Sequence, residues 1–269
     1  MLQQAVDFRE ECDALFTLLE TRAAQDWERK TQFKGWTIND VIAHLHFADY
    51  AADLALQDST AFKDFVLQVA EANKRGRKHL EFAHSWVGGI KNHDLLTRWR
   101  EFSLEMAERF AAADPKQRVL WFGPAMSVRS SITARLMETW AHAQAVYDLL
   151  GKERQNTDRV KNIAVLGINT FGWTFSNRKL PVPADPPYVR LTAPSKATWE
   201  WNQPSQENII EGSAVDFCQV VTQVRNIADT SLKVVGVTAT AWMSMAQCFA
   251  GPPENPPVPG SRFRQVEQR

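Results

Sequence analysis

Residue types that bind metal ions recur at helical spacing in the middle of the chain. Residues 131–151 read SITARLMETWAHAQAVYDLLG, and Arg135, Glu138 and His142 stand at positions i, i+3 and i+7 of one predicted helix. This spacing places them on a single stripe. The other side of the helix is apolar, and the polar stripe itself continues into Ala145 and Leu149, so we expect the helix to be enclosed on both sides. A buried glutamate and histidine must then be paired or must bind a metal.

A second predicted helix, over residues 38–57, contains two further histidines. Thr37 and Asp40 are close to a capping box at its start. His44 falls on the apolar stripe, whereas His46 lies about 200° round the axis, on the polar side. We therefore expect His44 to point inward and His46 to be a surface or rim residue. The acidic residues on the polar side are Asp49 and Asp53. The other histidines lie in or near polar stretches and are expected at the surface: His79, His84 and His93.

The two helices together offer two imidazoles and one carboxylate, from His44, Glu138 and His142. Such a set leaves coordination positions open for water or substrate. An open site suits Lewis-acid catalysis rather than structural metal binding. Spacing alone leaves an alternative, in which Glu138 and His142 form a hydrogen bond and His44 is an unrelated core histidine.

The composition is that of an ordinary globular protein. Of 269 residues, 44% are hydrophobic and 23% charged, and the 31 basic side chains balance the 31 acidic ones. No basic field argues for binding to nucleic acid or anionic membranes. The sequence has no signal-peptide pattern, no apolar run of spanning length and no disulfide framework among Cys12, Cys218 and Cys248. We expect a cytoplasmic protein that binds neither nucleic acid nor membrane.

The sequence pattern changes after Gly151, where prolines and short segments of alternating apolar and polar residues replace helical periodicity. We predict an α+β protein with a helical domain over 1–155, a small α+β domain over 156–258 and a tail over 259–269. Further helices are predicted over 2–25, 60–84, from Asn92 to Asp114, over 159–175, after the cap Ser213 and over 239–249. Strands are predicted from Tyr188, over 197–201, over 209–211 and from Lys233. The segment 251–260, GPPENPPVPG, has the composition of a disordered one.

Two segments, WTINDVIAHL at 36–45 and RLMETWAHAQ at 135–144, resemble the N-terminal half of the mycothiol-dependent maleylpyruvate isomerase family. That family lies within the DinB-like metal-binding four-helix bundles. The resemblance implies an up-and-down four-helix bundle followed by a smaller α+β domain. SAVDFCQVVTQVRN, KVVG and ATAWMSMAQCFAG are similar to the family's C-terminal domain. Segments such as LGINTFGW and YVRLTAPSKATWEW look closest to a branch of uncharacterised metal-binding proteins.

The family's motif is a helix capped by Trp-Thr, with a histidine eight residues after the tryptophan, and later an Arg-x-x-Glu-x-x-x-His helix. The matching residues are Trp36, His44, Arg135, Glu138 and His142. The resemblance implies that His44, Glu138 and His142 are the metal ligands. Relatives commonly place an aspartate three residues after the second ligand histidine, where this chain has Ala145. The site helix therefore lacks one carboxylate that could support a ligand.

Two arginines are candidates for holding an acidic substrate. In the isomerase an arginine of the C-terminal domain has this role, and Arg225 is the position that we match to it. Arg135, one turn from Glu138, is the second candidate. The alternative for both is a structural ion pair, or for Arg225 a favourable charge at a helix C-terminus.

Three functions are compatible with these residues. The first is a metal-dependent isomerase or thiol transferase, in which a divalent ion activates a low-molecular-weight thiol or polarises a small electrophilic, acidic substrate. Zinc is the preferred ion, with nickel and iron as alternatives. The second is a hydrolase or lyase that uses metal-bound water, and the third a non-catalytic metal- or ligand-binding protein. The chain's own cysteines are expected to be inert core groups. Dimerisation is left open.

Overall fold

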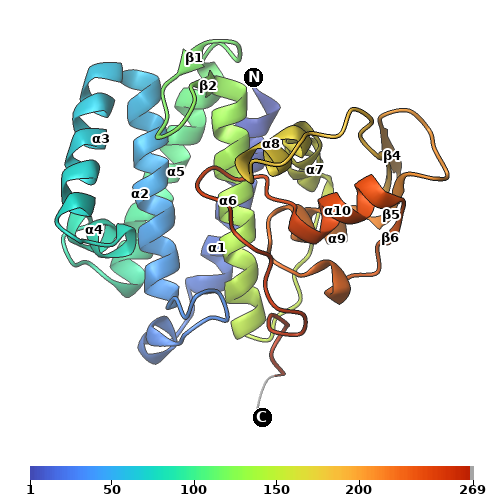
Figure 1. Cartoon of the computed structure of the whole chain (residues 1–269). Helices are drawn as coiled ribbons and strands as arrows, with labels where there is room; N and C mark the ends of the chain where they lie inside the picture. Colours follow the sequence, from blue (N-terminus) through green and yellow to red (C-terminus); the bar gives the residue numbers. More distant parts are fainter. Residues whose placement is uncertain (267–269) are drawn as a thin grey trace. The chain divides into compact units, whose positions relative to one another are not determined.

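The computed structural model describes residues 1–266, and the chain divides into two compact units at Leu149 and Leu150 (Figure 1). The first unit is helical and the second mixes helices with a small sheet, so the predicted α+β class is confirmed. The boundaries 1–155 and 156–258 remain a prediction of domain organisation. In the part of the chain that the structure describes, no helix is long and apolar enough to cross a membrane.

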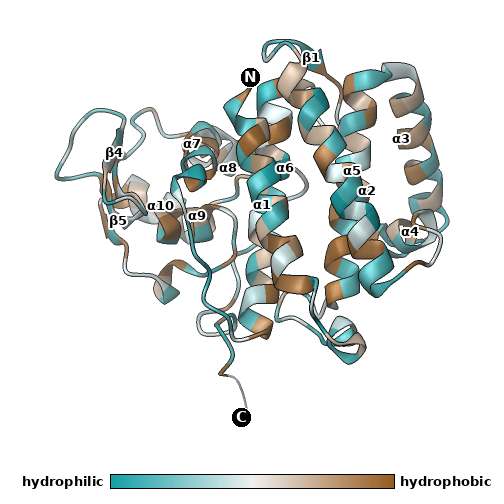
Figure 2. Ribbon diagram, turned by 180° about the vertical axis from the view of Figure 1, so that it is seen from behind, coloured by the Kyte–Doolittle hydropathy of each residue, from teal (hydrophilic) through white to brown (hydrophobic). Residues whose placement is uncertain are grey.

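Four long helices form the bundle of the first unit over its described residues. Helices α1 and α2 each pack against both α5 and α6. Hydrophobic and hydrophilic positions alternate along these helices (Figure 2), and apolar side chains from all four are buried in the core, among them Phe8, Leu45, Trp99 and Leu136. The bounds are α1 Gln3–Leu19, α2 Ile38–Gln57, α5 Asn92–Ala112 and α6 Val128–Leu149. A short 3₁₀ turn, η1 (Ala24–Glu28), lies between α1 and α2.

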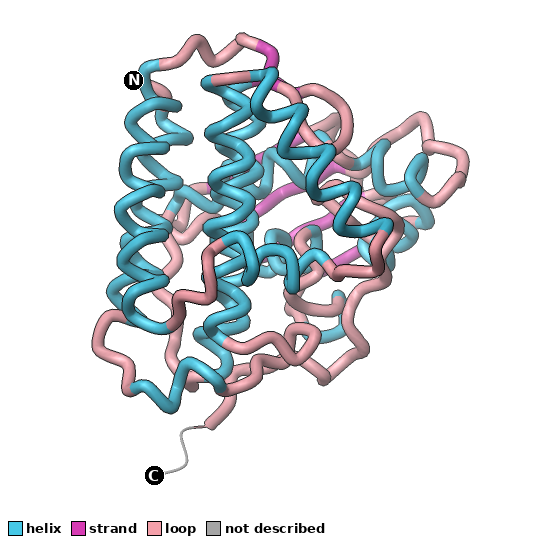
Figure 3. Tube along the Cα trace, turned by 90° about the vertical axis from the view of Figure 1, so that its left-hand side faces the viewer, coloured by secondary structure: helices cyan, strands magenta, loops and turns pink. Residues whose placement is uncertain are grey.

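One connection of the bundle is not a short turn. Asn39 and Asn92 share a hydrogen bond at the beginnings of α2 and α5, and Arg109 binds Asp53 near the ends of the same helices. Helices α2 and α5 therefore run in the same direction, so the bundle is not the up-and-down arrangement that the resemblance implied. Helices α3 (Ser59–Lys74) and α4 (His79–Trp86) carry the chain back between them and lie against α2 (Figure 3).

The single helix predicted over 60–84 is thus two helices. Gly76 separates them with a backbone φ of +79°, which favours glycine. Asp58 caps α3 by accepting the backbone N–H groups of Thr60 and Ala61. The break lets α4 turn and pack aromatic side chains on α2.

The caps and turns around the other bundle helices agree with their sequences. The capping box of Thr37 and Asp40 is present at the start of α2. Between α5 and α6 the chain forms two short antiparallel strands, β1 (Arg118–Val119) and β2 (Met126–Ser127). Gly151 follows α6 with a φ of +68°.

The second unit is built on a four-stranded mixed sheet, over its described residues, in the order β4-β3-β5-β6. Strands β3 and β5 are parallel, and the other neighbours are antiparallel. The strands are β3 Tyr188–Thr192, β4 Thr198–Trp201, β5 Ile209–Ser213 and β6 Lys233–Val235. The helices are η2 Asp158–Val160, α7 Lys161–Asn169, α8 Phe171–Asn177, α9 Ala214–Val221, η3 Ile227–Asp229 and α10 Val237–Met245. Ser213 caps α9 as predicted.

Three predictions for the second unit need correction. The helix expected over 159–175 is interrupted at Thr170, and the last helix is α10 rather than 239–249. The segment 251–260 is fixed rather than disordered, because Glu254 donates its N–H to Gln247 and Asn226 donates to the carbonyl of Pro257. Of the predicted tail 259–269, residues 267–269 lie outside the described part.

Candidate metal centre

The structure brings together the three side chains that the sequence singled out. The Nε2 atoms of His44 and His142 lie 3.4 Å and 3.2 Å from the same carboxylate oxygen, Oε2 of Glu138. One ligand atom from each residue lies within 4.8 Å of the other two. His44 comes from α2, and the other two residues come from α6. The donors therefore converge from two helices, as a site for one ion requires.

The separations fit shared coordination. Two donors that are each about 2.1 Å from one ion at a tetrahedral angle lie about 3.4 Å apart. A charge-assisted N–H···O bond is shorter, at about 2.7–2.9 Å. The observed 3.4 Å and 3.2 Å are closer to the spacing of ligands around an ion. A two-histidine, one-carboxylate set suits zinc, nickel or iron.

The charge states of the cluster also suit metal binding. Burial lowers the pKa of His44 to about 3, so its imidazole is neutral at neutral pH. Burial alone would raise the pKa of Glu138, but hydrogen bonds with His142 and His44 outweigh it and hold the pKa well below its usual range. An imidazole lone pair and an ionised carboxylate are the forms that bind a cation.

A buried ion pair holds the two site helices in register. Arg135 Nε lies 2.7 Å from Asp49 Oδ1, with 3% of the arginine and none of the aspartate exposed. The indole N–H of Trp99 donates to the other oxygen of Asp49 at 2.9 Å. Because Arg135 is one turn before Glu138 and Asp49 is five residues after His44, the pair fixes α6 against α2 beside the cluster.

This pair bears on the interpretation of Arg135. Its Nε binds Asp49, which favours the structural alternative over direct contact with a substrate anion, although its buried Nη2 has no hydrogen-bond partner. Arg225 lies beyond the end of α9, in the second unit, where its Nη1 donates to the carbonyl of Val224. Its role as a substrate-binding residue remains a prediction.

The predicted polar side of α2 is buried, so the placement of three residues there was wrong. His46 is 2% exposed, Asp49 0% and Asp53 4%. Helix α5 covers this side with Trp99, Phe102 and Arg109, and α4 adds Trp86. When a helix is packed on more than one side, its polar residues need not face solvent, so the periodicity of the sequence does not show which side is exposed.

His46 is unusual among these residues because neither ring nitrogen has a hydrogen-bond partner. Its ring packs against Trp86 and Phe102, with centroid distances of 5.0 Å and 5.3 Å. Burial, with a smaller contribution from Arg98, lowers the pKa of His46 to about 4. It is a core residue and not a donor to the cluster.

Aromatic rings form a wall beside the candidate ligands. The indole of Trp36 stacks on the ring of His142 at 5.4 Å and 6°, and lies 5.2 Å from the ring of His44. Phe33 meets His142 edge-on at 4.9 Å. Trp140, by contrast, is a core residue, 1% exposed. The loop before α2 therefore supplies a hydrophobic wall, which restricts the access of water to the donors.

Sequence reasoning missed one neighbour of the cluster. His79 is exposed, as expected of a surface residue, but its Nε2 lies 3.2 Å from Nδ1 of His44. It stands 35 residues from His44 with no shared periodicity, so no pattern signals the contact. The other two histidines that were expected at the surface bind elsewhere, His84 to Asp40 and His93 to the carbonyl of Glu20.

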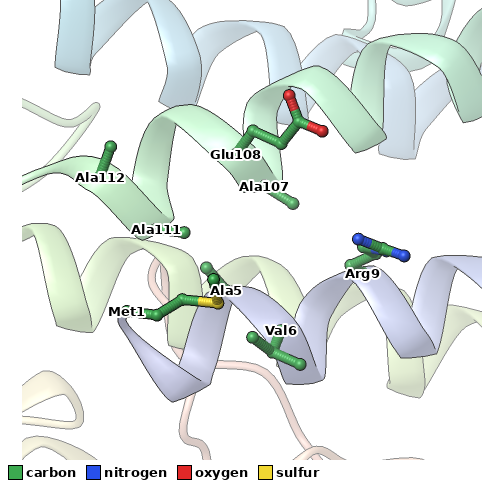
Figure 4. A pocket seen from close by; sticks show the side chains of 8 residues that line it. All are labelled: Met1, Ala5, Val6, Arg9, Ala107, Glu108, Ala111 and Ala112. Atoms are coloured by element: carbon green, nitrogen blue, oxygen red, sulfur yellow. The ribbon is translucent and has the colours of Figure 1, made fainter.

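A separate hollow of about 430 Å³ lies between α1 and α5 (Figure 4). Its lining is mostly apolar and contains no member of the metal cluster. Arg9 and Glu108 are the charged side chains at its wall. The hollow offers no set of metal donors, and we do not place the reaction there. The lining residues are Met1, Ala5, Val6, Arg9, Ala107, Glu108, Ala111 and Ala112.

Comparison with known proteins gives one family and one fold. The mycothiol maleylpyruvate isomerase N-terminal domain family matches residues 8–147. Two uncharacterised proteins of Mycobacterium tuberculosis, from strains CDC 1551 / Oshkosh and H37Rv, are each 38% identical over 247 residues, covering 92% of this chain and 95% of the relative.

The solved structures agree in fold. The crystal structure of the mycothiol-dependent maleylpyruvate isomerase aligns with a TM-score of 0.51 at 15% identity, covering 81% of this chain and 87% of that one. A histidine-to-alanine mutant of that enzyme aligns with a TM-score of 0.52 at 15% identity, covering 82% and 88%. At this identity the alignment shows the shared DinB-like fold.

Proposed function

This chain belongs to the mycothiol maleylpyruvate isomerase N-terminal domain family, and from that premise we propose that it is a metal-dependent enzyme acting on a small electrophilic substrate with the help of a thiol. The convergence of His44 Nε2 and His142 Nε2 on one oxygen of Glu138 carries the proposal. Three protein donors on two helices leave coordination positions for an exogenous ligand. Zinc is the ion that we expect first, with nickel and iron as alternatives.

Each residue of the cluster has a distinct task in this proposal. A bound divalent ion supplies Lewis acidity, which lowers the pKa of a thiol or polarises a carbonyl group. His44 and His142 bind the ion as neutral imidazoles, and Glu138 offsets one positive charge. Trp36 and Phe33 exclude water from the side of His142.

The thiol must come from a second small molecule. All three cysteines are buried and none forms a disulfide, and burial raises the pKa of Cys12 and Cys218 well above its usual value. A buried thiol with a raised pKa is a poor nucleophile. A low-molecular-weight thiol of the mycothiol type is therefore the cosubstrate that we propose, in an isomerisation or a transfer to an electrophilic carbon. An acidic substrate would be held by a basic side chain, for which Arg225 remains our candidate.

Elemental analysis of protein purified without chelator tests the metal. We expect about one equivalent of zinc, nickel or iron in the wild type, and its loss in E138Q, which keeps the shape of the side chain and removes the charge. H93A is the control, because His93 lies away from the cluster, with its Nε2 against the carbonyl of Glu20 and its ring against Trp27. A wild type that neither contains nor takes up these ions would refute the metal centre.

Cobalt substitution then tests the thiol. Addition of a low-molecular-weight thiol to the cobalt protein should produce a sulfur-to-cobalt charge-transfer band. Activity that is the same without any thiol would instead support the hydrolase or lyase alternative. Tight ligand binding without turnover would support a binding protein.

A further inference from the structure

The contact between His44 and His79 suggests how the metal centre is oriented. Nδ1 of His44 and Nε2 of His79 are 3.2 Å apart, within hydrogen-bonding distance, and the two rings meet at 67°. On the opposite side of the same ring, Nε2 of His44 faces the carboxylate of Glu138. Both nitrogens of this imidazole are therefore engaged, one with the ligand cluster and one with His79.

The direction of the hydrogen bond follows from the ring chemistry. A neutral imidazole carries one proton, and the nitrogen that binds a metal cannot carry it. If Nε2 of His44 is the donor atom to the ion, its Nδ1 must bear the hydrogen and needs an acceptor. Nε2 of His79 is in the position of that acceptor, which places the proton of His79 on its own Nδ1.

The fold holds His79 in this position. It is the first residue of α4, and its ring meets Phe47 of α2 edge-on at 5.0 Å. Phe82 and Trp86, further along α4, also pack on Phe47. A short helix anchored by aromatic contacts fixes the direction of its first side chain more firmly than a loop would.

We propose that His79 is a positioning residue of the metal centre: it accepts the Nδ1–H of His44 and so fixes the tautomer and ring orientation in which His44 Nε2 meets the ion. This inference rests on the proposed function, because it assumes that His44 is a metal ligand. Partners of this kind contribute about 10–100-fold to metal affinity in other sites.

The test is the affinity of the purified protein for Zn²⁺ alone, measured by competition with a chromophoric chelator. H79F keeps an aromatic ring against Phe47 and removes the acceptor, and we expect it to bind zinc about 10–100-fold more weakly. H79Q restores an acceptor through its amide oxygen and should lie within about 3-fold of the wild type. Melting temperatures of the zinc-free wild type and variants show whether a variant that binds zinc weakly is still folded.

H84F is the matched control on the same helix. The ring of His84 binds Asp40 at the start of α2 rather than the ring of His44, so its loss should lower stability without changing zinc affinity. Equal zinc affinity of H79F and the wild type would overturn the inference while leaving the metal centre intact. A wild type that binds no zinc, nickel or iron would overturn the proposed function itself, and the inference with it.

Discussion

The buried ion pair between Arg135 and Asp49 gives the sharpest prediction about stability. D49N removes the carboxylate charge and leaves the guanidinium of Arg135, 3% exposed, without its counter-ion. Removing one partner of a buried pair costs about 3–5 kcal/mol, because the remaining charge stays desolvated. The asparagine oxygen can still accept the indole N–H of Trp99, so the decrease in the free energy of unfolding comes mainly from the lost carboxylate charge.

The size of the effect can be read from urea unfolding followed by tryptophan fluorescence. With an m-value of about 2–3 kcal/mol/M, a loss of about 3–5 kcal/mol lowers the midpoint by about 1–2.5 M. The double variant D49N/R135M removes both charges and should recover most of the loss, to within about 2 kcal/mol of the wild type. W99F removes the same hydrogen bond but also leaves a cavity, because Trp99 is fully buried, and should cost about 2–4 kcal/mol.

We expect the same pair to affect the proposed metal ligands. In D49N the guanidinium of Arg135 lies one turn from Glu138 and can pair with that carboxylate instead. Zinc affinity should then fall in D49N and recover in D49N/R135M. A loss below about 1 kcal/mol in D49N, or losses that simply add in the double variant, would refute the reasoning that Arg135 and Asp49 form a coupled pair.

Three further substitutions have defined outcomes. H46F should stabilise the protein, by about 2 kcal/mol at pH 5 and by less at pH 8, in paired urea titrations. The sign follows from the pKa of His46, which is about 4 in the folded protein and 6.5 in an unfolded chain. As the pH falls below 6.5, the unfolded state binds a proton that the folded state does not, so the stability of the wild type decreases. T37A removes the cap of α2 and should cost about 1 kcal/mol in the same assay, whereas T37S should not. G236A should cost about 3 kcal/mol or more in thermal unfolding, because φ is +98° and the new Cβ would lie 2.3 Å from the carbonyl oxygen of Glu207. G123A, which meets nothing within 4 Å, is its control.

Each of these predictions has a result that would contradict it. An H46F gain that is equal at pH 5 and pH 8 would mean that burial of the neutral imidazole is not the cause. Equal stability of T37A and T37S would mean that the hydroxyl cap does not stabilise α2. A G236A protein that melts with the wild type would show that the backbone there can relax.

The sequence predicted how the candidate ligands are placed within each helix. A period of 3.6 residues places Glu138 and His142 on one face of α6 whatever surrounds that helix. Local capping chemistry placed the start of α2 at Thr37, and the apolar stripe chose His44 over His46 as the residue that faces α6. These features depend on neighbours within one or two turns, which is why they can be read from a single chain.

Only the tertiary structure decided what covers the other faces. Periodicity identified the side of α2 that carries His46 and Asp49 as polar, but α4 and α5 bury that side. Asp49 forms its ion pair with Arg135, which is 86 residues away in the sequence. The turn at Gly76 changes the direction of the chain before α4, so that His79 lies against the ring of His44. Contacts between distant segments depend on how whole helices pack, and the spacing within one helix contains no information about its neighbours.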